Sequence, residues 1–277
     1  MKSRKVLAVA ILTLNEELDL DACLLSVSQM DCDIYVFDSN STDDTQKIAM
    51  ERGATVVKFS WNGKYPKKKQ WAINFLKDSY EWLLLLDADE LLSPFLISEI
   101  QRIISKKDDI VAFDAKLEYW FLGQKLRFGL KAYKRILFQP SAVFFPEIND
   151  LEVSNMWEVE GHYQPKVLTG NVGKLKNALI HRDTGSLFDY ISRHNRYSDW
   201  ESYVNCNSEL KALLADYQPK RTRIFSSLPL KGFFIFIYSY IYKLGFLDGR
   251  KGFDFAAHKA FYYWQIKAKT VESFEND

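Results

Sequence analysis

The sequence predicts an α/β protein in which a mostly parallel central sheet is flanked by helices and followed by a helical C-terminal extension. Strand-like and helix-like segments alternate over the first hundred residues with short connections, which is typical of a doubly wound sheet. Leu83–Leu86 follow Trp82 without a polar interruption, as in strands buried on both faces. From residue 220 onward the chain becomes basic and aromatic. We therefore expect one domain over residues 1–218 and an extension over residues 219–277.

The expected elements follow one another in a regular order. Apolar runs predict strands at residues 6–13, 34–37, 54–59, 82–86, 111–117 and 136–138. Helical patterns predict a helix that ends near residue 30 and helices at residues 45–52, 67–78, 95–105 and 187–216. Capping residues precede Thr45, Gly53 stands where a helix stop belongs, and Pro94 suits a first helical turn. Residues 157–163 alternate in polarity, which predicts a strand or an extended loop.

Composition excludes several classes of protein. The chain has 277 residues and a net charge of +1, so it lacks the protein-wide basic field of a nucleic-acid-binding protein. Its three cysteines have no metal-binding spacing, and we expect free thiols in a reducing compartment. The apolar N-terminal segment is too short for a signal peptide and is expected to be the first strand. No apolar run reaches the roughly 18–20 residues of a membrane-spanning helix.

Acidic residues appear abruptly where the leucine-rich strand ends. Asp87 and Asp89 are two residues apart, so both side chains leave an extended backbone on the same side. Two carboxylates beside an apolar core repel each other unless a cation or strong donors lie between them. Mg²⁺ and Mn²⁺ are hard divalent ions that bind carboxylate and phosphate oxygens. The sequence therefore predicts a site for Mg²⁺ or Mn²⁺ at this strand end.

Other polar residues follow the ends of two further predicted strands. Residues 13–16 come after the first strand, and Asp38 closes the second. The carboxyl ends of parallel strands meet at one rim of the sheet, where ligands bind. The glycine-rich loops that cradle ATP or dinucleotides are absent from the sequence. A rim of carboxylates and hydroxyls with a metal ion suits a nucleotide-linked substrate.

These segments strongly resemble a known family. Residues 9–16, 36–45 and 85–90 occur in an order and spacing similar to those of the family-2 inverting glycosyltransferases, which have the GT-A fold. Residues 63–72 and 245–253 resemble the branch that builds bacterial surface polysaccharide and lipopolysaccharide core. The resemblance covers most of the chain and implies the GT-A (nucleotide-diphospho-sugar transferase) fold.

The resemblance also implies roles for individual residues. It implies a sugar-nucleotide donor, usually a UDP-sugar, with Asp38 at the nucleobase. Asp87 and Asp89 would then handle the ribose and the metal-bridged diphosphate. Related enzymes carry a histidine after such a strand, so His181 is expected to support the metal. Lys69 matches a basic position of the family and is expected at the phosphates. The remaining residues expected around the donor are Thr13, Asn15 and Glu16.

Inverting transfer requires a base that takes the proton of the acceptor hydroxyl. Glu158, Glu160 and His162 alternate along one segment, and the resembling enzymes place an acidic residue near this point. We predict Glu160 as the base, then Glu158, with Asp150 as a further candidate.

The C-terminal segment indicates where the protein acts. Residues 232–247 are apolar and aromatic, and basic residues flank them, as in helices that lie in a membrane interface. The alternative is a helix packed on the first domain or on a second subunit. We therefore expect a hexosyltransferase that is peripheral on the cytoplasmic face of the inner membrane and acts on a lipid-linked or lipopolysaccharide-type acceptor. The alternative functions are a nucleotidyltransferase and a catalytically silent binding module on the membrane.

Overall fold

The computed structural model describes residues 4–106, 109–153, 158–161, 163–182, 185–215 and 230–276. The strands are β1 (Lys5–Thr13), β2 (Asp33–Asp38), β3 (Thr55–Lys58), β4 (Tyr80–Asp87), β5 (Glu90–Leu91), β6 (Ile110–Phe121), β7 (Gln124–Lys125), β8 (Tyr133–Phe138), β9 (Val143–Phe144), β10 (Lys166–Val167), β11 (Asn171–Lys174) and β12 (Leu179–Arg182). The α-helices are α1 (Leu20–Val27), α2 (Thr45–Glu51), α3 (Lys68–Leu76), α4 (Pro94–Ile104), α5 (Leu187–Cys206), α6 (Ser208–Ala215), α8 (Lys231–Ile237) and α9 (Gly249–Asn276). A π-helical turn, η1 (Tyr238–Tyr242), and a 3₁₀ turn, η2 (Gly245–Asp248), lie between α8 and α9.

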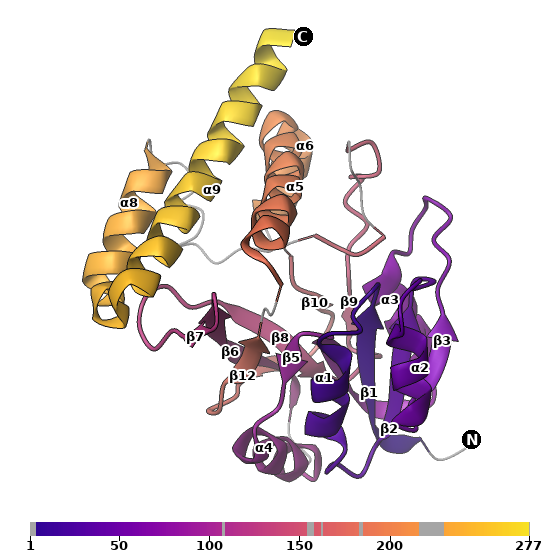
Figure 1. Ribbon diagram of the computed structural model, residues 1–277. Coiled ribbons are helices and arrows are strands. Elements are labelled where there is room, and N and C mark those ends of the chain that lie inside the picture. Colours follow the sequence, from indigo (N-terminus) through magenta and orange to yellow (C-terminus); the bar gives the residue numbers. More distant parts are fainter. Residues whose placement is uncertain are drawn as a thin grey trace.

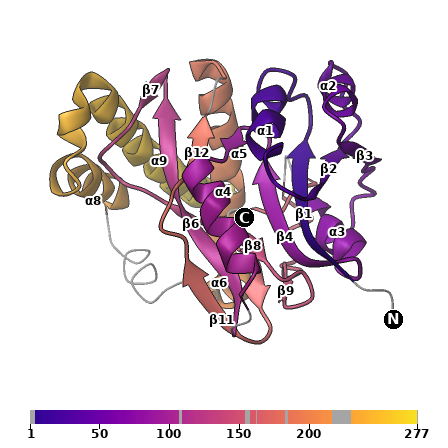
Figure 2. The same cartoon turned by 90° about the horizontal axis from the view of Figure 1, so that it is seen from below.

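A ten-stranded mixed sheet forms the centre of the molecule (Figures 1 and 2). Its order is β3-β2-β1-β4-β8-β6-β12-β5, and β7 and β11 also pair with β6. The strands β3, β2, β1 and β4 are mutually parallel, as the sequence predicts. Strand β8 is antiparallel to both β4 and β6, so the sheet is mixed beyond β4. Antiparallel pairing needs only a short connection, and residues 122–132 supply it between β6 and β8.

Two apolar cores cover the two faces of this sheet. Alternate residues of β1 point into opposite cores. Val9 packs in the core under α1 and α4, and Ala10 packs in the core under α3. The leucines of β4 divide in the same way, and Leu84 and Leu85 face opposite cores. Residues 7–13 of β1 and 82–86 of β4 are all buried, on one face of the sheet or the other, so an unbroken apolar run is needed there. The central strand is therefore held firmly, and the polar residues that follow it start from a fixed position.

The middle of the chain differs from the prediction in two places. The single helix predicted over residues 187–216 is two helices, because Asn207 is extended and its side chain accepts a hydrogen bond from the Leu210 amide at 3.0 Å. Asparagine competes with the helix in this way and starts a new one. Residues 158–161 have no regular secondary structure, and residues 154–157 and 162 lie outside the described residues.

The C-terminal helices pack on the sheet domain and on each other. Helix α9 lies along α5 and forms a hairpin with α8 (Figure 1). The Asp248 carboxylate accepts hydrogen bonds from the amides of Arg127 and Phe128 at 3.1 and 2.8 Å, which fastens the hairpin to the β7–β8 connection. In the part of the chain that the structure describes, no helix is both long enough and apolar enough to span a membrane.

His258 on α9 makes the packing of α5 against α9 sensitive to acid. Its ring lies against Tyr190 and His194, and burial, helped by the Lys259 charge, lowers its pKa from 6.5 to about 4. Between pH 6.5 and 4 the unfolded chain therefore binds a proton that the folded chain does not, and stability falls as the pH falls. We expect His258→Phe to remove about 1–2 kcal/mol of this loss, after allowance for the ring's partial exposure to water. Thermal unfolding of the wild type and of His258→Phe at pH 7 and pH 5 measures this loss of stability. An equal pH dependence in the two proteins would contradict the prediction.

Candidate functional site

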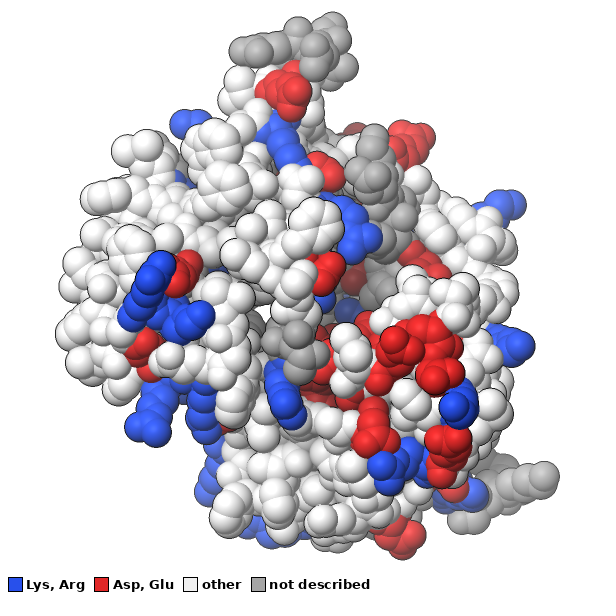
Figure 3. Space-filling view, viewed as in Figure 1, with Lys and Arg blue, Asp and Glu red and all other residues white. Residues whose placement is uncertain are grey.

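The carboxyl ends of β1, β2 and β4 meet at one edge of the sheet, below α5 (Figure 1). Figure 3 shows a concentration of acidic side chains at this edge. Four of the predicted donor residues, Thr13, Glu16, Asp38 and Asp87, lie there because their strands are neighbours in the sheet. The topology thus gathers residues that are up to about seventy positions apart in the sequence.

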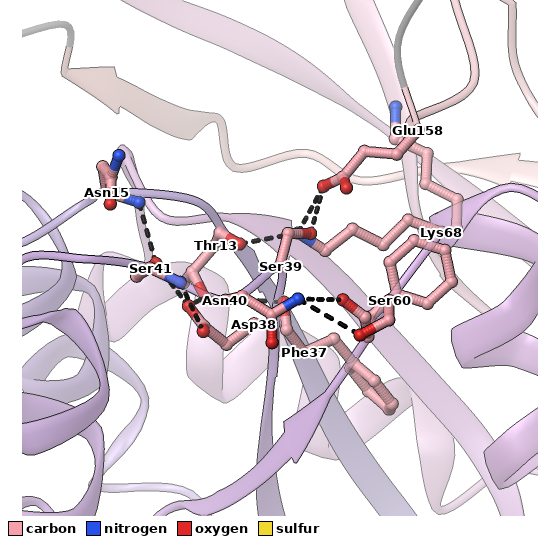
Figure 4. Close-up of polar contacts among 12 residues, drawn as sticks. Thr13, Asn15, Phe37, Asp38, Ser39, Asn40, Ser41, Ser60, Lys68 and Glu158 are labelled. Carbon is pink, nitrogen blue, oxygen red and sulfur yellow. Dashed lines mark hydrogen bonds and ion pairs between the residues drawn. The ribbon is translucent and has the colours of Figure 1, made fainter. Parts of the chain in front are cut away.

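Asp38 is the buried centre of the first half of the site. Its carboxylate accepts hydrogen bonds from Thr13 Oγ1 at 3.0 Å, the Ser41 amide at 2.9 Å and Gln46 Nε2 at 2.6 Å (Figure 4). A fully buried carboxylate needs donors of this kind. Asp38 therefore holds the loop after β2 in one conformation, and its contact with a nucleobase stays a prediction.

Asn15 and Glu16 connect the loop after β1 to the loop after β2. Asn15 has a φ of 57°, and its side-chain oxygen accepts a hydrogen bond from the Thr42 amide at 2.9 Å. The Glu16 amide donates to Thr45 Oγ1 at 2.8 Å. Burial, together with the charges of Asp89, Asp19 and Asp87, raises the pKa of Glu16 to about 8. Glu16 thus lies beside the acidic end of β4, and its contact with the donor stays a prediction.

The three consecutive lysines at the start of α3, Lys67–Lys69, differ in their exposure to solvent. Lys67 is fully buried in an ion pair with Asp150, at 2.8 Å between Nζ and Oδ1. Asp150 also accepts a hydrogen bond from Trp200 Nε1 at 2.7 Å. This carboxylate is fully enclosed, and the role of Asp150 as a base stays a prediction. Lys68 is also buried and donates to the Thr13 carbonyl at 2.6 Å. Lys69 is partly exposed, and its charge lies close enough to Asp87 to lower the pKa of that carboxyl.

The segment with the two predicted bases caps the first turn of α3. The Lys68 amide donates to the Glu158 carbonyl at 2.7 Å, and the amides of Lys69 and Gln70 donate to the Glu160 carboxylate, each at 2.8 Å. Helix N-termini favour such acceptors because their first N–H groups have no intrahelical partner. Glu160 is 4% exposed and both of its oxygens accept hydrogen bonds. Its place is thus structural, and its role as a base stays a prediction.

The Glu158 side chain, unlike that of Glu160, does not accept hydrogen bonds from the first amides of α3. Its Oε1 accepts hydrogen bonds from Ser39 Oγ and from Lys68 Nζ, the latter at 3.2 Å (Figure 4). The side chain keeps 19% of its surface exposed at the rim. Lys68 lies near the charges of Glu158, Asp38 and Asp87, so these carboxylates surround one ammonium group. His162, the third member of the alternating set, lies outside the described residues.

Asp87 is engaged by a lysine that the sequence analysis did not identify. Lys134 Nζ lies 2.6 Å from Asp87 Oδ2 and 2.6 Å from Glu90 Oε2. Burial raises the pKa of Asp87, but the Lys134 and Lys69 charges outweigh it and hold that pKa well below its ordinary range. The repulsion expected among the acids is thus relieved by a side chain of the protein. No local signal marks Lys134, because only the pairing of β8 with its neighbours brings it to the rim.

Asp89 and His181 have the features of metal ligands. Asp89 Oδ2 lies 3.4 Å from His181 Nε2, since β5 and β12 pair at Glu90 and His181. Within the described residues, Asp89 Oδ1 and His181 Nδ1 are buried without a hydrogen-bond partner. No group of three or more His, Cys, Asp or Glu side chains that could hold a metal occurs in the described ranges. One or two protein ligands fit Mg²⁺ or Mn²⁺, since substrate phosphates and water supply the others.

Helix α5 brings a further side chain toward the rim. The Arg193 charge lowers the pKa of Glu16, although burial and the neighbouring acids raise it more strongly. Tyr197, one turn further along α5, is partly buried near Arg193, Asp87 and Asp89, and this burial raises its pKa to about 12. Helix α5 thus brings the charge of Arg193 near the acidic residues of the rim.

Comparisons with known proteins identify the domain. The family model described as glycosyl transferase family 2 matches residues 8–145. A glycosyltransferase of Rickettsia prowazekii is 30% identical over 199 residues, which are 70% of this chain and 66% of the relative. One of Rickettsia typhi is 34% identical over 123 residues, which are 44% of this chain and 41% of the relative. The chain thus spans less than two thirds of the length of these relatives.

Solved structures of low sequence identity are also similar. A mannosyltransferase from Pyrobaculum calidifontis in complex with GDP-mannose and Mn²⁺ is 12% identical, with a TM-score of 0.48 over 98% of this chain and 88% of its own. Glucosyl-3-phosphoglycerate synthase from Mycobacterium tuberculosis, in complex with Mn²⁺, UDP and phosphoglyceric acid, is 16% identical. Its TM-score is 0.45, and the match covers 72% of this chain and 78% of the synthase chain. The mixed sheet, the helices on its faces and the helical C-terminal part form a GT-A-like fold. Residues 8–145 of the chain thus form a glycosyl transferase family 2 domain.

Proposed function

We propose that this protein transfers a hexose, with inversion, from a nucleotide-diphosphate sugar to an acceptor hydroxyl. The donor is a UDP-sugar, and the acceptor is a lipid-linked or lipopolysaccharide-type glycan. The observation that carries the proposal is the pair Asp89 and His181, whose buried atoms lack hydrogen-bond partners among the described residues. Buried polar atoms without partners are costly and mark a site that a ligand completes. Asp38 and Glu16 lie at the same rim, where the nucleotide would bind.

The side chains divide the work of such a transfer. Asp89 and His181 would hold Mg²⁺ or Mn²⁺, which when bound stabilises the negative charge on the leaving diphosphate. Lys69 adds positive potential at the same place, because its charge already reaches Asp87. Asp38, fully buried and hydrogen-bonded to Thr13 and Ser41, fixes the loop after β2 that would line the nucleobase. Each group is fixed by the sheet before the donor arrives, which favours the transition state.

Of the two predicted bases, the structure favours Glu158. Both oxygens of Glu160 already accept N–H groups of α3, so proton uptake there would disrupt the start of the helix. Glu158 lies at the rim beside Ser39, and its side chain retains 19% of its surface exposed. A base must come within about 3 Å of the hydroxyl that it deprotonates, which an exposed carboxylate can do. We therefore assign proton removal to Glu158.

Donor hydrolysis tests the proposed activity. The protein is incubated with Mn²⁺ and a panel of UDP-, GDP- and dTDP-sugars, and release of the nucleoside diphosphate is followed. Slow release of UDP from one UDP-sugar supports the proposal. Release of pyrophosphate from UTP would instead show a nucleotidyltransferase, and absence of nucleotide binding would show a silent module. Either of these results overturns the assignment.

The C-terminal hairpin supports a peripheral place on an anionic membrane. Large apolar side chains are exposed along it, including Phe233 at 60%, Ile241 at 53% and Tyr242 at 72%. Lys243 Nζ lies over the rings of Tyr238 and Tyr242, at 5.4 and 5.6 Å from their centroids. Figure 3 shows basic side chains, with a few acidic ones beside them, within a mostly uncharged surface at the left, where α8 and the start of α9 lie. Aromatic anchors combined with basic residues are typical of interfacial helices.

We expect replacement of Phe233, Ile241 and Tyr242 by serine to weaken binding to vesicles of phosphatidylcholine and phosphatidylglycerol by about tenfold or more, because apolar burial is lost. Flotation of the full chain measures this. Phe95→Ser is the matched control, since Phe95 is 75% exposed on α4, outside the hairpin. Equal flotation of the triple variant and the wild type, or no flotation of either, would remove the membrane assignment.

A further inference from the structure

Lys134 lies between two carboxylates at the rim, and the roles assigned so far give it no function. Its Nζ is 2.6 Å from Asp87 Oδ2 and 2.6 Å from Glu90 Oε2. The lysine side chain is 13% exposed and that of Glu90 only 1%. The Lys134–Glu90 pair differs from a surface salt bridge, because water cannot replace either partner at low cost, whereas the Asp87 side chain keeps 40% of its surface exposed.

The antiparallel strand β8 is what brings this cation to the end of β4. Leu83 of β4 pairs with Phe138 of β8, and Leu84 pairs with Leu137. Continued along both strands, this register sets Lys134 opposite Asp87. A parallel neighbour would begin at the other edge of the sheet and would not place its first residues here. The single reversed strand beside β4 therefore supplies a cation where the parallel strands supply only acids.

The contacts of Lys134 separate the two aspartates. Glu90 Oε2 accepts a hydrogen bond from the Asp87 amide at 2.9 Å and another from Lys134 Nζ. The Glu90 carboxylate therefore closes the turn from Asp87 to Glu90. The Arg182 amide donates to the Asp89 carbonyl at 2.9 Å, which fixes the other side of the turn. Asp87 is thus drawn toward β8, whereas the Asp89 side chain points toward His181 on β12. One aspartate is neutralised by the protein and the other is left with an unpartnered oxygen among the described residues.

We propose that Lys134 is a positioning residue that engages Asp87 and thereby leaves the metal to Asp89 and His181. Asp87 then contacts the sugar-nucleotide donor and does not bind the metal ion. A metal held by two protein groups keeps more of its positions open for the diphosphate than one held by three. The inference rests on the proposed function, since it divides the roles within the same site.

Mn²⁺ binding without nucleotide tests this division. We compare the wild type with Lys134→Met, which removes the charge, and follow free Mn²⁺ by electron paramagnetic resonance. The variant is expected to bind Mn²⁺ about tenfold more tightly, because a positive charge is lost beside the site and Asp87 becomes available. UDP release from the UDP-sugar is expected to fall at least about tenfold, because Asp87 is then drawn to the ion. Unchanged or weaker Mn²⁺ binding by the folded variant would overturn the proposal.

Further variants separate this role from a purely structural one. Lys134→Arg keeps the charge and should keep Mn²⁺ affinity near the wild-type value. Lys116→Met removes an exposed lysine of β6 in the same sheet and should change neither Mn²⁺ binding nor UDP release. If Lys134→Met does not fold, Lys134→Gln removes the same charge and retains two N–H donors. Mn²⁺ binding is measured without a donor and therefore does not depend on transferase activity. Failure of the wild type to release UDP would refute the proposed function, but the Mn²⁺ affinities of the wild type and Lys134→Met could still be compared.

Discussion

Replacement of Asp89 by asparagine is expected to abolish metal-dependent UDP release while leaving the fold intact. Asp89 offers the metal a buried oxygen without a hydrogen-bond partner in the described residues, and asparagine is a far weaker ligand for Mg²⁺ or Mn²⁺. We expect a fall of at least about a hundredfold in release, as for loss of other groups that stabilise transition-state charge. The melting temperature should stay equal or rise, since one of three clustered carboxylates no longer repels the others.

The control for this variant is Asp44→Asn, which removes an exposed carboxylate before α2 and should change neither activity nor stability. Titration with Mn²⁺ should show loss of ion binding in Asp89→Asn alone. Full activity in Asp89→Asn would show that the ion, if it binds, is held elsewhere. A sharp loss of stability would instead give Asp89 a structural role.

Glu158→Gln and Glu160→Gln are expected to fail in different ways. Loss of a base typically costs about 10²- to 10⁴-fold in rate, so Glu158→Gln should lower kcat by that order with little change in affinity for UDP. Glu160→Gln should lower the free energy of unfolding by about 1–2 kcal/mol, because the amide replaces a charged acceptor at the start of α3. Its kcat should remain within a few-fold of the wild type.

Each variant is the control for the other, and both are assayed at a temperature where circular dichroism shows a folded protein. Glu158→Gln also leaves the buried Lys68 without its ion-pair partner, so some loss of stability is expected there too. The decisive quantity is therefore kcat. A fall in kcat in Glu160→Gln that is absent from Glu158→Gln would reverse the assignment and restore the order predicted from the sequence.

The parallel half of the fold could be predicted because its signals are local. Four leucines before Asp87 require a strand buried on both faces, and β4 runs from Tyr80 to Asp87 between two cores. Asp38 and Thr13 were placed at the same rim because parallel strands end together, and the two side chains are in fact hydrogen-bonded. In each case, the residue type and its position in or at the end of a strand are enough to predict where the residue lies in the sheet.

The rest depends on pairings between distant segments. Lys134 reaches Asp87 only because β8 runs antiparallel beside β4, and nothing around Lys134 announces that direction. Lys67 is one of three consecutive lysines, and nothing in that run announces its burial against Asp150, which lies in a segment about eighty residues later. Glu160 alternates with Glu158 like a residue on an exposed face, yet its carboxylate caps α3. Long-range register and capping set these positions, and a sequence pattern read locally does not contain them.

Calorimetric titration of UDP into the full chain, once with Mn²⁺ and once with a chelator, tests the central claim most directly. We expect measurable binding in the presence of Mn²⁺ that weakens at least about tenfold when the ion is removed, since Asp89 and His181 bind the nucleotide only through it. Absence of both Mn²⁺ uptake and UDP binding by the folded protein would contradict the account of this site.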